Sequence, residues 1–218
     1  MPAATNNPTI DADRLWNSLM DMAKVGATPR GGCNRQALTE QDRTGRNLFV
    51  RWATEAHCEV SVDQAGNLFA VRAGTERDAD PVLLASHLDT QPTGGKFDGV
   101  YGVLAGLEVV RTLNDHGITT RRPMEVVNWT NEEGARFAPA MVASGVFAGA
   151  FDHAWASSRK DPDGITFAEA LEKIGYRGPQ KCGEHPLSGF FELHIEQGPL
   201  LEAEAKEIGI VTGIQGIR

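Results

Sequence analysis

The chain has 218 residues, 41% of them hydrophobic and 23% charged, which suits a water-soluble domain with a sizeable core. Its 29 acidic residues outnumber its 21 basic residues, and the formal net charge of -8 disfavours binding to nucleic acid. No apolar run approaches the roughly 18 residues that span a bilayer, and no secretory signal is visible, so we expect a cytoplasmic protein with no membrane partner. The three cysteines (Cys33, Cys58 and Cys182) form no CxxC pair, so we expect their thiols to be reduced.

The first part of the chain predicts two helices after a loose tail over residues 1–10. Residues 11–25 place four apolar side chains on one helical face: Leu15, Trp16, Leu19 and Met22. A second helix is expected to run from a Thr39 cap to about Ala56.

The remaining elements follow in alternation. Alternating and β-branched residues predict a hairpin over 59–63 and 67–72. Further strands are expected at four apolar runs: 82–85, 124–129, 190–195 and 208–214. Helices are expected over 100–113, partly over 137–147, and over 166–174 behind a Thr166 capping box, whereas the polar stretch 152–165 predicts a linker. The predicted fold is therefore α/β, with a mostly parallel central sheet flanked by helices.

Chemistry-bearing side chains gather just beyond the predicted strands or just before a helix. They are His87, Asp89, Asp98, Glu132, Glu133, His194 and Glu196. Because sites in open parallel sheets form beyond the carboxyl ends of the strands, we expect these distant residues to converge.

Their residue types indicate a metal site. Imidazole and carboxylate ligands together suit zinc, and also manganese or cobalt. An aspartate can bridge two cations about 4 Å apart, and such a pair can share one water. Residues i and i+2 of an extended segment share a side, so we expect Asp89 to hold the far ring nitrogen of His87.

Other chemistries fit the pattern less well. Ser86, His87 and Asp89 are the residue types of a catalytic triad, but Ser86 and His87 are neighbours on one extended segment and point to opposite faces. The glycine-rich loop over 94–99 lacks the GxxxxGK[ST] pattern of a phosphate-binding loop. Two carboxylates alone would suit a glycosidase, which leaves the histidines unexplained.

Four segments resemble the hydantoinase/carbamoylase branch of the M20 metallopeptidase-like amidases, which includes N-carbamoyl-L-amino acid hydrolases, allantoate amidohydrolases and β-ureidopropionases. They are LASHLDT (84–90), GGKFDG (94–99), TNEEGARF (130–137) and HIEQGP (194–199). HxD with a later EE would indicate only the wider superfamily, whereas NEEGARF with HIEQGP is typical of this branch. The resemblance begins near Gly31 and implies a zinc-aminopeptidase-like catalytic domain.

The resemblance also implies a metal ligand set. His87 and His194 correspond to ligands of one ion, Glu133 to a ligand of the other, and Asp98 to the bridging ligand. The implied cofactors are two divalent ions, zinc or manganese, with cobalt or nickel as alternatives.

Three further residues receive roles from the same resemblance. Glu132 corresponds to the general base that takes a proton from the bridging water and passes it to the leaving nitrogen. Asp89 corresponds to the residue that orients His87, and Gln197 to a substrate contact.

Members of this branch are longer than this chain. The resemblance implies a lid or dimerisation domain entered after a strand like 208–214, and a returning segment with a fifth ligand, a histidine. Residues 11–218 are therefore expected to form the N-terminal part of a catalytic domain that is incomplete at its C-terminus.

The implied reaction is hydrolysis of the C–N amide bond of an N-carbamoyl-L-amino acid or a related linear ureido compound. The resemblance implies a homodimer, and we expect the isolated chain to be inactive or nearly so. An M20 aminoacylase or dipeptidase, or a noncatalytic fragment acting as a binding module, are the alternatives.

Overall fold

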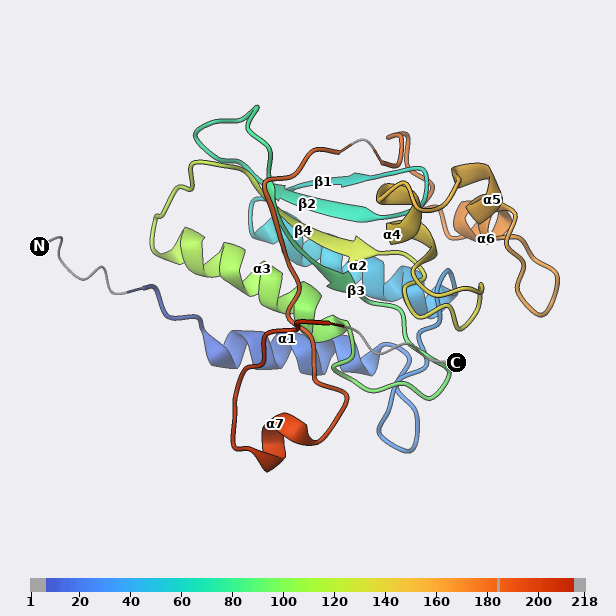
Figure 1. Ribbon diagram of the computed structural model, residues 1–218, viewed down its shortest axis with the longest axis horizontal. Helices are drawn as coiled ribbons and strands as arrows, with labels where there is room; N and C mark the ends of the chain where they lie inside the picture. Colours follow the sequence, from blue (N-terminus) through green and yellow to red (C-terminus); the bar gives the residue numbers. More distant parts are fainter. Residues whose placement is uncertain (1–6, 184, 214–218) are drawn as a thin grey trace, which may run out of the picture.

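Five strands form one sheet in the order β1-β2-β4-β3-β5 in this computed structural model, which describes residues 7–183 and 185–213 (Figure 1). The strands are β1 (Glu59–Val62), β2 (Leu68–Arg72), β3 (Val82–His87), β4 (Met124–Trp129) and β5 (Gly189–Phe191). β2 pairs antiparallel with β1 and with β4, whereas β3 pairs parallel with β4 and β5. Only β2 runs against the other described strands, which confirms the predicted hairpin and the mostly parallel sheet.

The two central strands carry near-continuous apolar runs because both of their faces are covered. Val126 of β4 packs into the core on the helical side of the sheet. Val127 packs with Leu83 and Trp129 into a smaller cluster on the opposite face. The carboxyl ends of β3 and β4 are in register, with His87 opposite Trp129, so the loops that follow them emerge side by side.

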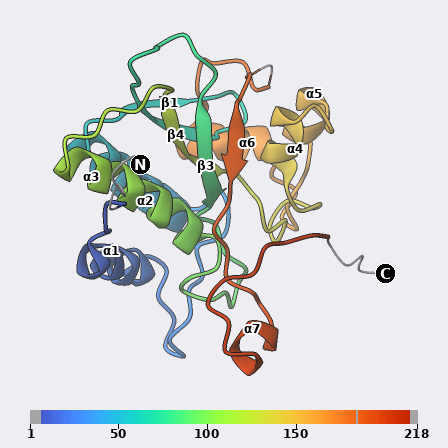
Figure 2. The ribbon, with the colours of Figure 1, turned by 60° about the vertical axis from the view of Figure 1, so that its left-hand side comes forward.

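Three helices lie on one side of the sheet: α1 (Ala12–Lys24), α2 (Glu40–Glu55) and α3 (Val100–Asp115) (Figures 1 and 2). α3 packs on β3 and β4, α2 packs on β1 and β2, and α1 packs on α3. The side chains of Asp11 and Thr39 cap the first two helices by accepting a hydrogen bond from a backbone N–H of the first turn. All three helices were predicted by the sequence.

The apolar face of α1 is buried except at Trp16. Leu15, Leu19 and Met22 pack into the main core, whereas Trp16 is 54% exposed. Successive helical residues point about 100° apart, so Trp16 is turned away from the face that Leu15 buries. Its ring instead lies 6.0 Å from that of Phe97, in the loop before α3. The prediction that Trp16 shares the buried face is wrong.

A second apolar cluster lies at one end of the sheet and is built on three short helices, α4 (Val142–Phe147), α5 (His153–Ser157) and α6 (Phe167–Lys173) (Figure 1). Thr166 opens α6 with a capping box, as predicted. The stretch 152–165 is more than a linker: Asp152 caps α5, and Ala156 of this helix is buried in the cluster.

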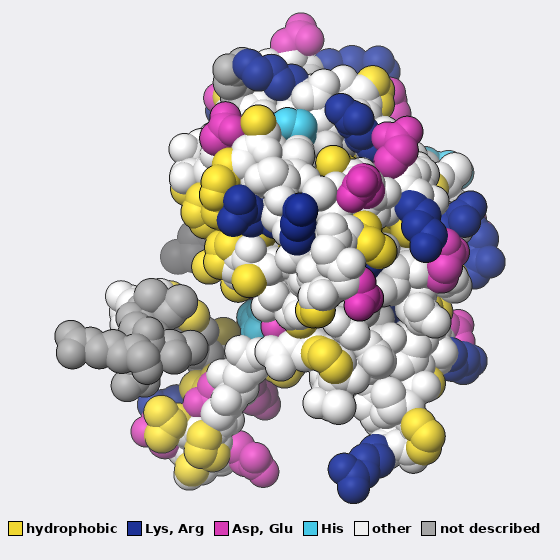
Figure 3. All heavy atoms as spheres, turned by 90° about the vertical axis from the view of Figure 1, so that its right-hand side faces the viewer, with side chains coloured by type: hydrophobic (Ala, Val, Ile, Leu, Met, Phe, Trp, Pro, Cys, Tyr) yellow, Lys and Arg dark blue, Asp and Glu magenta, His cyan; other side chains and the backbone are white. Residues whose placement is uncertain are grey.

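The chain leaves the sheet after β5 and continues as an arm, residues 192–213, that carries the short helix α7 (Leu200–Ala203). Figure 3 shows this arm as a lobe set off from the body, with hydrophobic and acidic side chains on its surface. The strand predicted over 190–195 ends at Phe191. The strand predicted over 208–214 is wrong for 208–213, and residue 214 lies outside the described residues.

The physical reason is the lack of a partner backbone. Apolar alternation yields a strand only where another strand can share its hydrogen bonds. The described part of the arm meets none beyond β5, and Ile208 and Ile210 are 76% and 89% exposed. At the other terminus, residues 7–10 of the predicted tail form no regular element, and residues 1–6 lie outside the described residues. Within the described range, no helix has the length and apolar character to cross a bilayer.

Candidate metal centre

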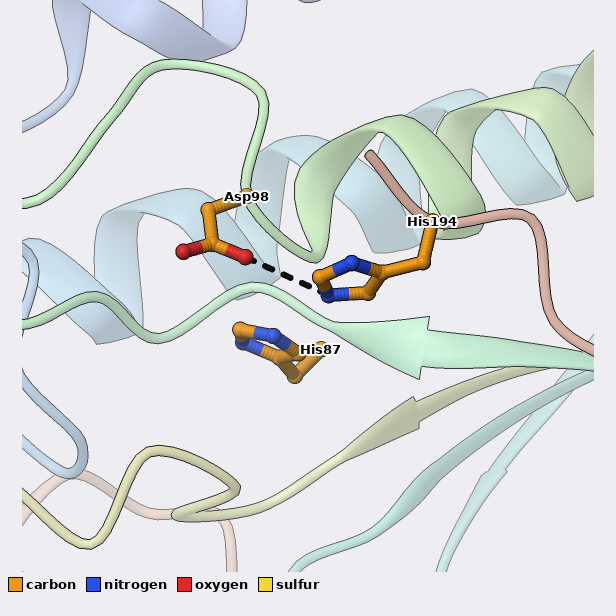
Figure 4. A group of neighbouring side chains, drawn as sticks. All are labelled: His87, Asp98 and His194. Carbon is orange, nitrogen blue, oxygen red and sulfur yellow. Dashed lines mark ion pairs between the residues drawn. The ribbon is translucent and has the colours of Figure 1, made fainter. Parts of the chain in front are cut away.

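Three predicted ligands meet beyond the carboxyl end of β3 (Figure 4). His87 ends this strand, Asp98 lies in the loop before α3, and His194 comes from the arm. Each offers one ligand atom, and these atoms lie within 4.8 Å of one another. His194 Nε2 is 3.2 Å from Asp98 Oδ1, and the two imidazoles stack with their centroids 6.1 Å apart. The predicted convergence is therefore present for these three residues.

His87 is held with one ring nitrogen directed at the site. The side chain is 1% exposed, and its Nδ1 lies 2.9 Å from the main-chain oxygen of Asp89. A carbonyl only accepts, so Nδ1 carries a proton in this contact, and in the neutral imidazole the lone pair lies on Nε2. Nε2 is buried without a hydrogen-bond partner among the described residues and lies 3.4 Å from Glu132 Oε2. In its neutral form, His87 would offer this nitrogen to a metal.

The carboxylate of Asp89 does not make the predicted hydrogen bond to His87. Asp89 Oδ1 is 3.9 Å from His87 Nδ1, outside hydrogen-bond distance. The carboxylate instead accepts hydrogen bonds from the backbone N–H groups of Glu132 (3.1 Å) and Glu133 (3.2 Å). The period-two argument needs extended backbone, and β3 ends at His87. Asp89 thus contacts the imidazole through its main chain and the glutamate pair through its side chain.

The two glutamates border the group formed by His87, Asp98 and His194 without belonging to it. Glu133 Oε2 accepts from Gln91 Nε2 at 3.1 Å, while Glu133 Oε1 is buried without a partner among the described residues. The backbone of Glu133 is tied to the His87 loop through Asp89, yet its carboxylate falls outside the three-residue group. Glu132 reaches that group through its contact with His87.

The electrostatics of this cluster favour a cation. Burial, and then the carboxylates of Asp89 and Glu133, raise the pKa of Glu132, although His87 opposes them. Burial also raises the pKa of Asp89. For His87, burial acts to lower the pKa, but the nearby carboxylates of Asp89 and Glu132 outweigh it and raise the pKa above its ordinary value. The carboxylates thus create a negative field around the buried imidazole.

Gln197 lies beside Asp98 rather than apart from the site. Its Nε2 is 3.0 Å from Asp98 Oδ1 and 2.9 Å from Asp98 Oδ2. Glu196, the neighbouring carboxylate, is used elsewhere, since it accepts from the backbone N–H groups of Leu200 and Leu201 and caps α7. Of the two adjacent polar residues, only Gln197 therefore contacts a candidate ligand.

Sequence reasoning missed three residues that shape the site. Gln91 contacts Glu133, Glu192 accepts a 2.7 Å hydrogen bond from Ser86 Oγ, and Gly99 lies directly against the ring of His87. Gln91 follows Asp89 by two residues and Glu192 precedes His194 by two. Both lie outside the strands, where a spacing of two residues does not set which side chains share a face.

The donor set fits a divalent cation. Two imidazoles and an aspartate are ligands that zinc and manganese accept. Two buried candidate ligand atoms, His87 Nε2 and Glu133 Oε1, lack a hydrogen-bond partner among the described residues, although such atoms are usually hydrogen-bonded. The described geometry thus provides one possible metal-binding group, His87, Asp98 and His194, with the glutamates beside it.

Comparison with known proteins places the site in a family. The chain is 57% identical over 217 residues to an N-carbamoyl-L-amino-acid amidohydrolase of Rhizobium meliloti, a match covering 100% of this chain and 52% of that protein. It is 33% identical over 208 residues to the allantoate amidohydrolase of Bacillus subtilis, covering 93% of this chain and 50% of that protein. The chain spans about half the length of the curated relatives it matches.

Solved structures agree with the sequence relatives. A crystal structure of an amidase of the hydantoinase/carbamoylase family from Burkholderia multivorans superposes with a TM-score of 0.90 at 64% identity, covering 91% of this chain and 48% of that chain. The family model described as peptidase family M20/M25/M40 matches residues 83–214, which include all four predicted metal ligands. The chain therefore belongs to the peptidase family M20/M25/M40.

Proposed function

We propose that this chain supplies the metal centre of an amidohydrolase that cleaves the C–N amide bond of N-carbamoyl-L-amino acids or related linear ureido compounds. The observation that carries this proposal is the meeting of His87, Asp98 and His194 at the carboxyl end of β3, next to Glu132. The names of the relatives, an N-carbamoyl-L-amino-acid amidohydrolase and an allantoate amidohydrolase, support the substrate class.

The ligands are assigned by their chemistry and their neighbours. His87 and His194 would hold one divalent ion, Asp98 would bridge, and Glu133 would contribute to a second ion. When bound, such ions, zinc or manganese, would supply Lewis acidity at the scissile carbonyl and acidify the attacking water. The buried, unpartnered oxygen of Glu133 supports its assignment, because a carboxylate oxygen without a hydrogen-bond donor is stabilised by a cation.

Glu132 is the proton carrier in this proposal. Its carboxylate lies 3.4 Å from the buried ring nitrogen Nε2 of His87, one of the proposed ligands. There it takes a proton from the attacking water and delivers it to the leaving nitrogen. With a carbamoyl substrate, water adds to the carbamoyl carbon and one C–N bond breaks, giving an amine and a carbamic acid. The carbamic acid then decomposes, so that the net products are ammonia, carbon dioxide and the free amino acid. Asp89 fixes the backbone of Glu132, and Gln197 is placed to contact the substrate near Asp98.

Metal analysis of the chain tests the site. The purified chain is stripped with a chelator, titrated with zinc or manganese, and compared with D98N and H194A variants. We expect tight binding that both substitutions weaken by at least tenfold, because each removes one ligand. A chain that binds no divalent ion would overturn the proposed metal centre and favour a noncatalytic binding module.

A substrate panel tests the reaction in the whole protein that contains this chain. Ammonia release from N-carbamoyl-L-amino acids and allantoate is compared with hydrolysis of N-acetyl amino acids and dipeptides. We expect turnover of the ureido compounds and little of the others. The reverse preference would make the protein an aminoacylase or dipeptidase. Residues 1–218 alone are expected to turn over slowly or not at all, since the Glu133 carboxylate stands outside the three-ligand group.

A further inference from the structure

His194 lies on a segment that the sheet does not hold. β5 pairs with β3 only as far as Phe191, opposite Leu84, and residues 192–195 belong to no described strand. The backbone that carries this ligand is therefore free of ladder hydrogen bonds to β3. Other contacts have to keep the His194 imidazole beside that of His87.

One such contact is a side-chain hydrogen bond between the two chain segments. Ser86 Oγ donates to Glu192 Oε1 at 2.7 Å. Ser86 is fully buried and directly precedes His87, while Glu192 precedes His194 by two residues. This bond extends the β3–β5 connection beyond the last paired residues. It also links the two backbone segments that carry the imidazoles.

A second contact packs the segment that carries His194 against α3. A Cβ added to Gly102 would stand 2.5 Å from the main-chain oxygen of Leu193 and 2.7 Å from Ser86 Cβ. Only a residue without a side chain permits this approach. The first turn of α3, the end of β3 and the start of the arm thus meet at Ser86, and Leu193 is the residue between Glu192 and His194 in the chain.

We propose that Ser86 and Glu192 are positioning residues that hold His194 at the metal centre, and this inference rests on the proposed function of that centre. Other described contacts of this part of the arm are those of Gln197 and of the His194 ring with Asp98, and the stacking of His194 on His87. Without the Ser86–Glu192 hydrogen bond, residues 192–195 would have to become ordered when the His194 imidazole binds a cation. Ordering of backbone opposes binding, so affinity falls.

The test measures metal affinity in the chain with S86A, E192A and the double variant. Each single substitution is expected to weaken zinc binding on the order of tenfold, since a hydrogen bond to a charged group is lost. The double variant is expected to bind no more weakly than either single variant, because both remove the same bond. Additive losses, or wild-type affinity in S86A, would overturn the proposal.

A conservative variant separates positioning from direct ligation. E192Q keeps an amide oxygen that accepts from Ser86, so we expect it to retain most of the affinity and to leave the cobalt absorption spectrum unchanged. If Glu192 instead bound the ion directly, E192Q would lose as much as E192A and alter the spectrum. That outcome would overturn the positioning role.

The chain offers a matched control at the other end of the same strand pair. Ser188 Oγ donates to the main-chain oxygen of Pro81 at 3.1 Å, just before β5 and β3 begin. S188A removes a serine hydrogen bond between the same two segments, but far from the ligands. We expect S188A to bind zinc as the wild type does. A loss equal to that of S86A would show that any weakening of the β3–β5 pair suffices, and would overturn the specific role of Ser86.

A readout without metal distinguishes failure of this inference from failure of the proposed function. Hydrogen exchange of the metal-free chain is followed at the amides of residues 193–196. S86A and E192A are expected to speed exchange there, and S188A to leave it unchanged. If S86A and E192A speed exchange while the wild type binds no metal, the Ser86–Glu192 bond restrains the arm as proposed, and the proposed metal centre is wrong. If the wild type binds metal and S86A leaves exchange unchanged, the proposed positioning role of Ser86 and Glu192 is wrong.

Discussion

The imidazole of His87 lies directly against the backbone of Gly99. A Cβ built on Gly99 would stand 2.3 Å from His87 Nε2 and 2.4 Å from Cε1, well inside van der Waals contact. Gly99 also has φ of +67°, in the left-handed region, where the chain turns from Asp98 into α3. The ligand atoms of Asp98 and His87 lie within 4.8 Å of each other, and the residue after Asp98 has no side chain that would displace the His87 ring.

Substitution of this glycine is expected to disable the metal centre. G99A forces the His87 ring to move and places an alanine in a strained backbone conformation, so we predict zinc affinity lower on the order of 100-fold. G95A is the control, because nothing lies within 4 Å of a Cβ at Gly95 in the same loop. Titration of both variants measures the effect, with circular dichroism to verify folding. Equal affinity in G99A and G95A would contradict this account.

The fold was predictable where a residue pattern favoured a single type of secondary structure. The apolar runs 82–85 and 124–129 suit only buried strands, and both are central in the sheet. The polar residues after these runs then had to emerge at one edge, which is why His87 and Glu132 were found to lie together. The site was predictable to the level of which loops meet.

Side-chain partners were less predictable, because they depend on where each strand stops. The length of β3 decides whether the carboxylate or the carbonyl of Asp89 faces His87, and the sequence around Leu88 does not mark that end. Likewise, the apolar residues over 208–213 alternate as a strand would, but pairing depends on a partner backbone that the local sequence cannot specify. Glu192 was overlooked because a carboxylate beside an apolar run looks like ordinary surface.

A buried arginine, Arg35, stabilises the segment that follows His87. Arg35 is fully buried; its Nε donates to the main-chain oxygen of Leu88 at 2.8 Å, and its Nη1 donates to those of Met22 (3.1 Å) and Val25 (2.7 Å) at the end of α1. The carbonyl groups at a helix C-terminus carry partial negative charge, which stabilises the guanidinium. Arg35 thereby joins α1 to the segment between His87 and Asp89.

Removal of this arginine is expected to destabilise the protein strongly. R35M removes the guanidinium hydrogen bonds to three carbonyl groups, of which that of Met22 still accepts from the Val25 N–H. We predict a loss of about 3–5 kcal/mol in the free energy of unfolding. Urea denaturation provides the measurement. R51M serves as the control: the Arg51 side chain is 63% exposed and 3.8 Å from Glu55, so its loss is expected to cost less than about 0.5 kcal/mol. Similar losses in the two variants would contradict the supporting role of Arg35.

The ion pair between His185 and Glu125 predicts a pH dependence of stability. His185 Nε2 lies 2.9 Å from Glu125 Oε2, and the His185 ring stacks on Phe69 at 5.6 Å. The hydrogen bond with Glu125 raises the pKa of His185, although burial opposes the rise. Because the folded-state pKa exceeds the unfolded value of about 6.5, the pair stabilises fully below that value. This stabilisation is lost as pH rises through the folded-state pKa.

The prediction concerns the difference in unfolding free energy between the wild type and H185Q. We expect the wild-type advantage to be largest near pH 5.5 and to shrink toward about pH 8.5, as His185 loses its charge in the folded state. Urea titrations at intervals across this range measure it. H116Q removes a histidine whose ring contacts a main-chain oxygen, that of Thr112, and controls for loss of an imidazole as such. A wild-type advantage that grows with pH would show that the sign is wrong.

Glu132 provides the sharpest separation of catalysis from metal binding. E132Q keeps the size and backbone contacts of the side chain but cannot accept a proton, so in the whole protein we predict a fall in kcat of roughly 100-fold to 10,000-fold for an N-carbamoyl-L-amino acid. Metal content is expected to stay at the wild-type level, because Glu132 stands outside the three-ligand group. E196Q is the control, since Glu196 caps α7 and is expected to alter kcat by only a few-fold. Parallel loss of metal and activity in E132Q would instead make Glu132 a ligand.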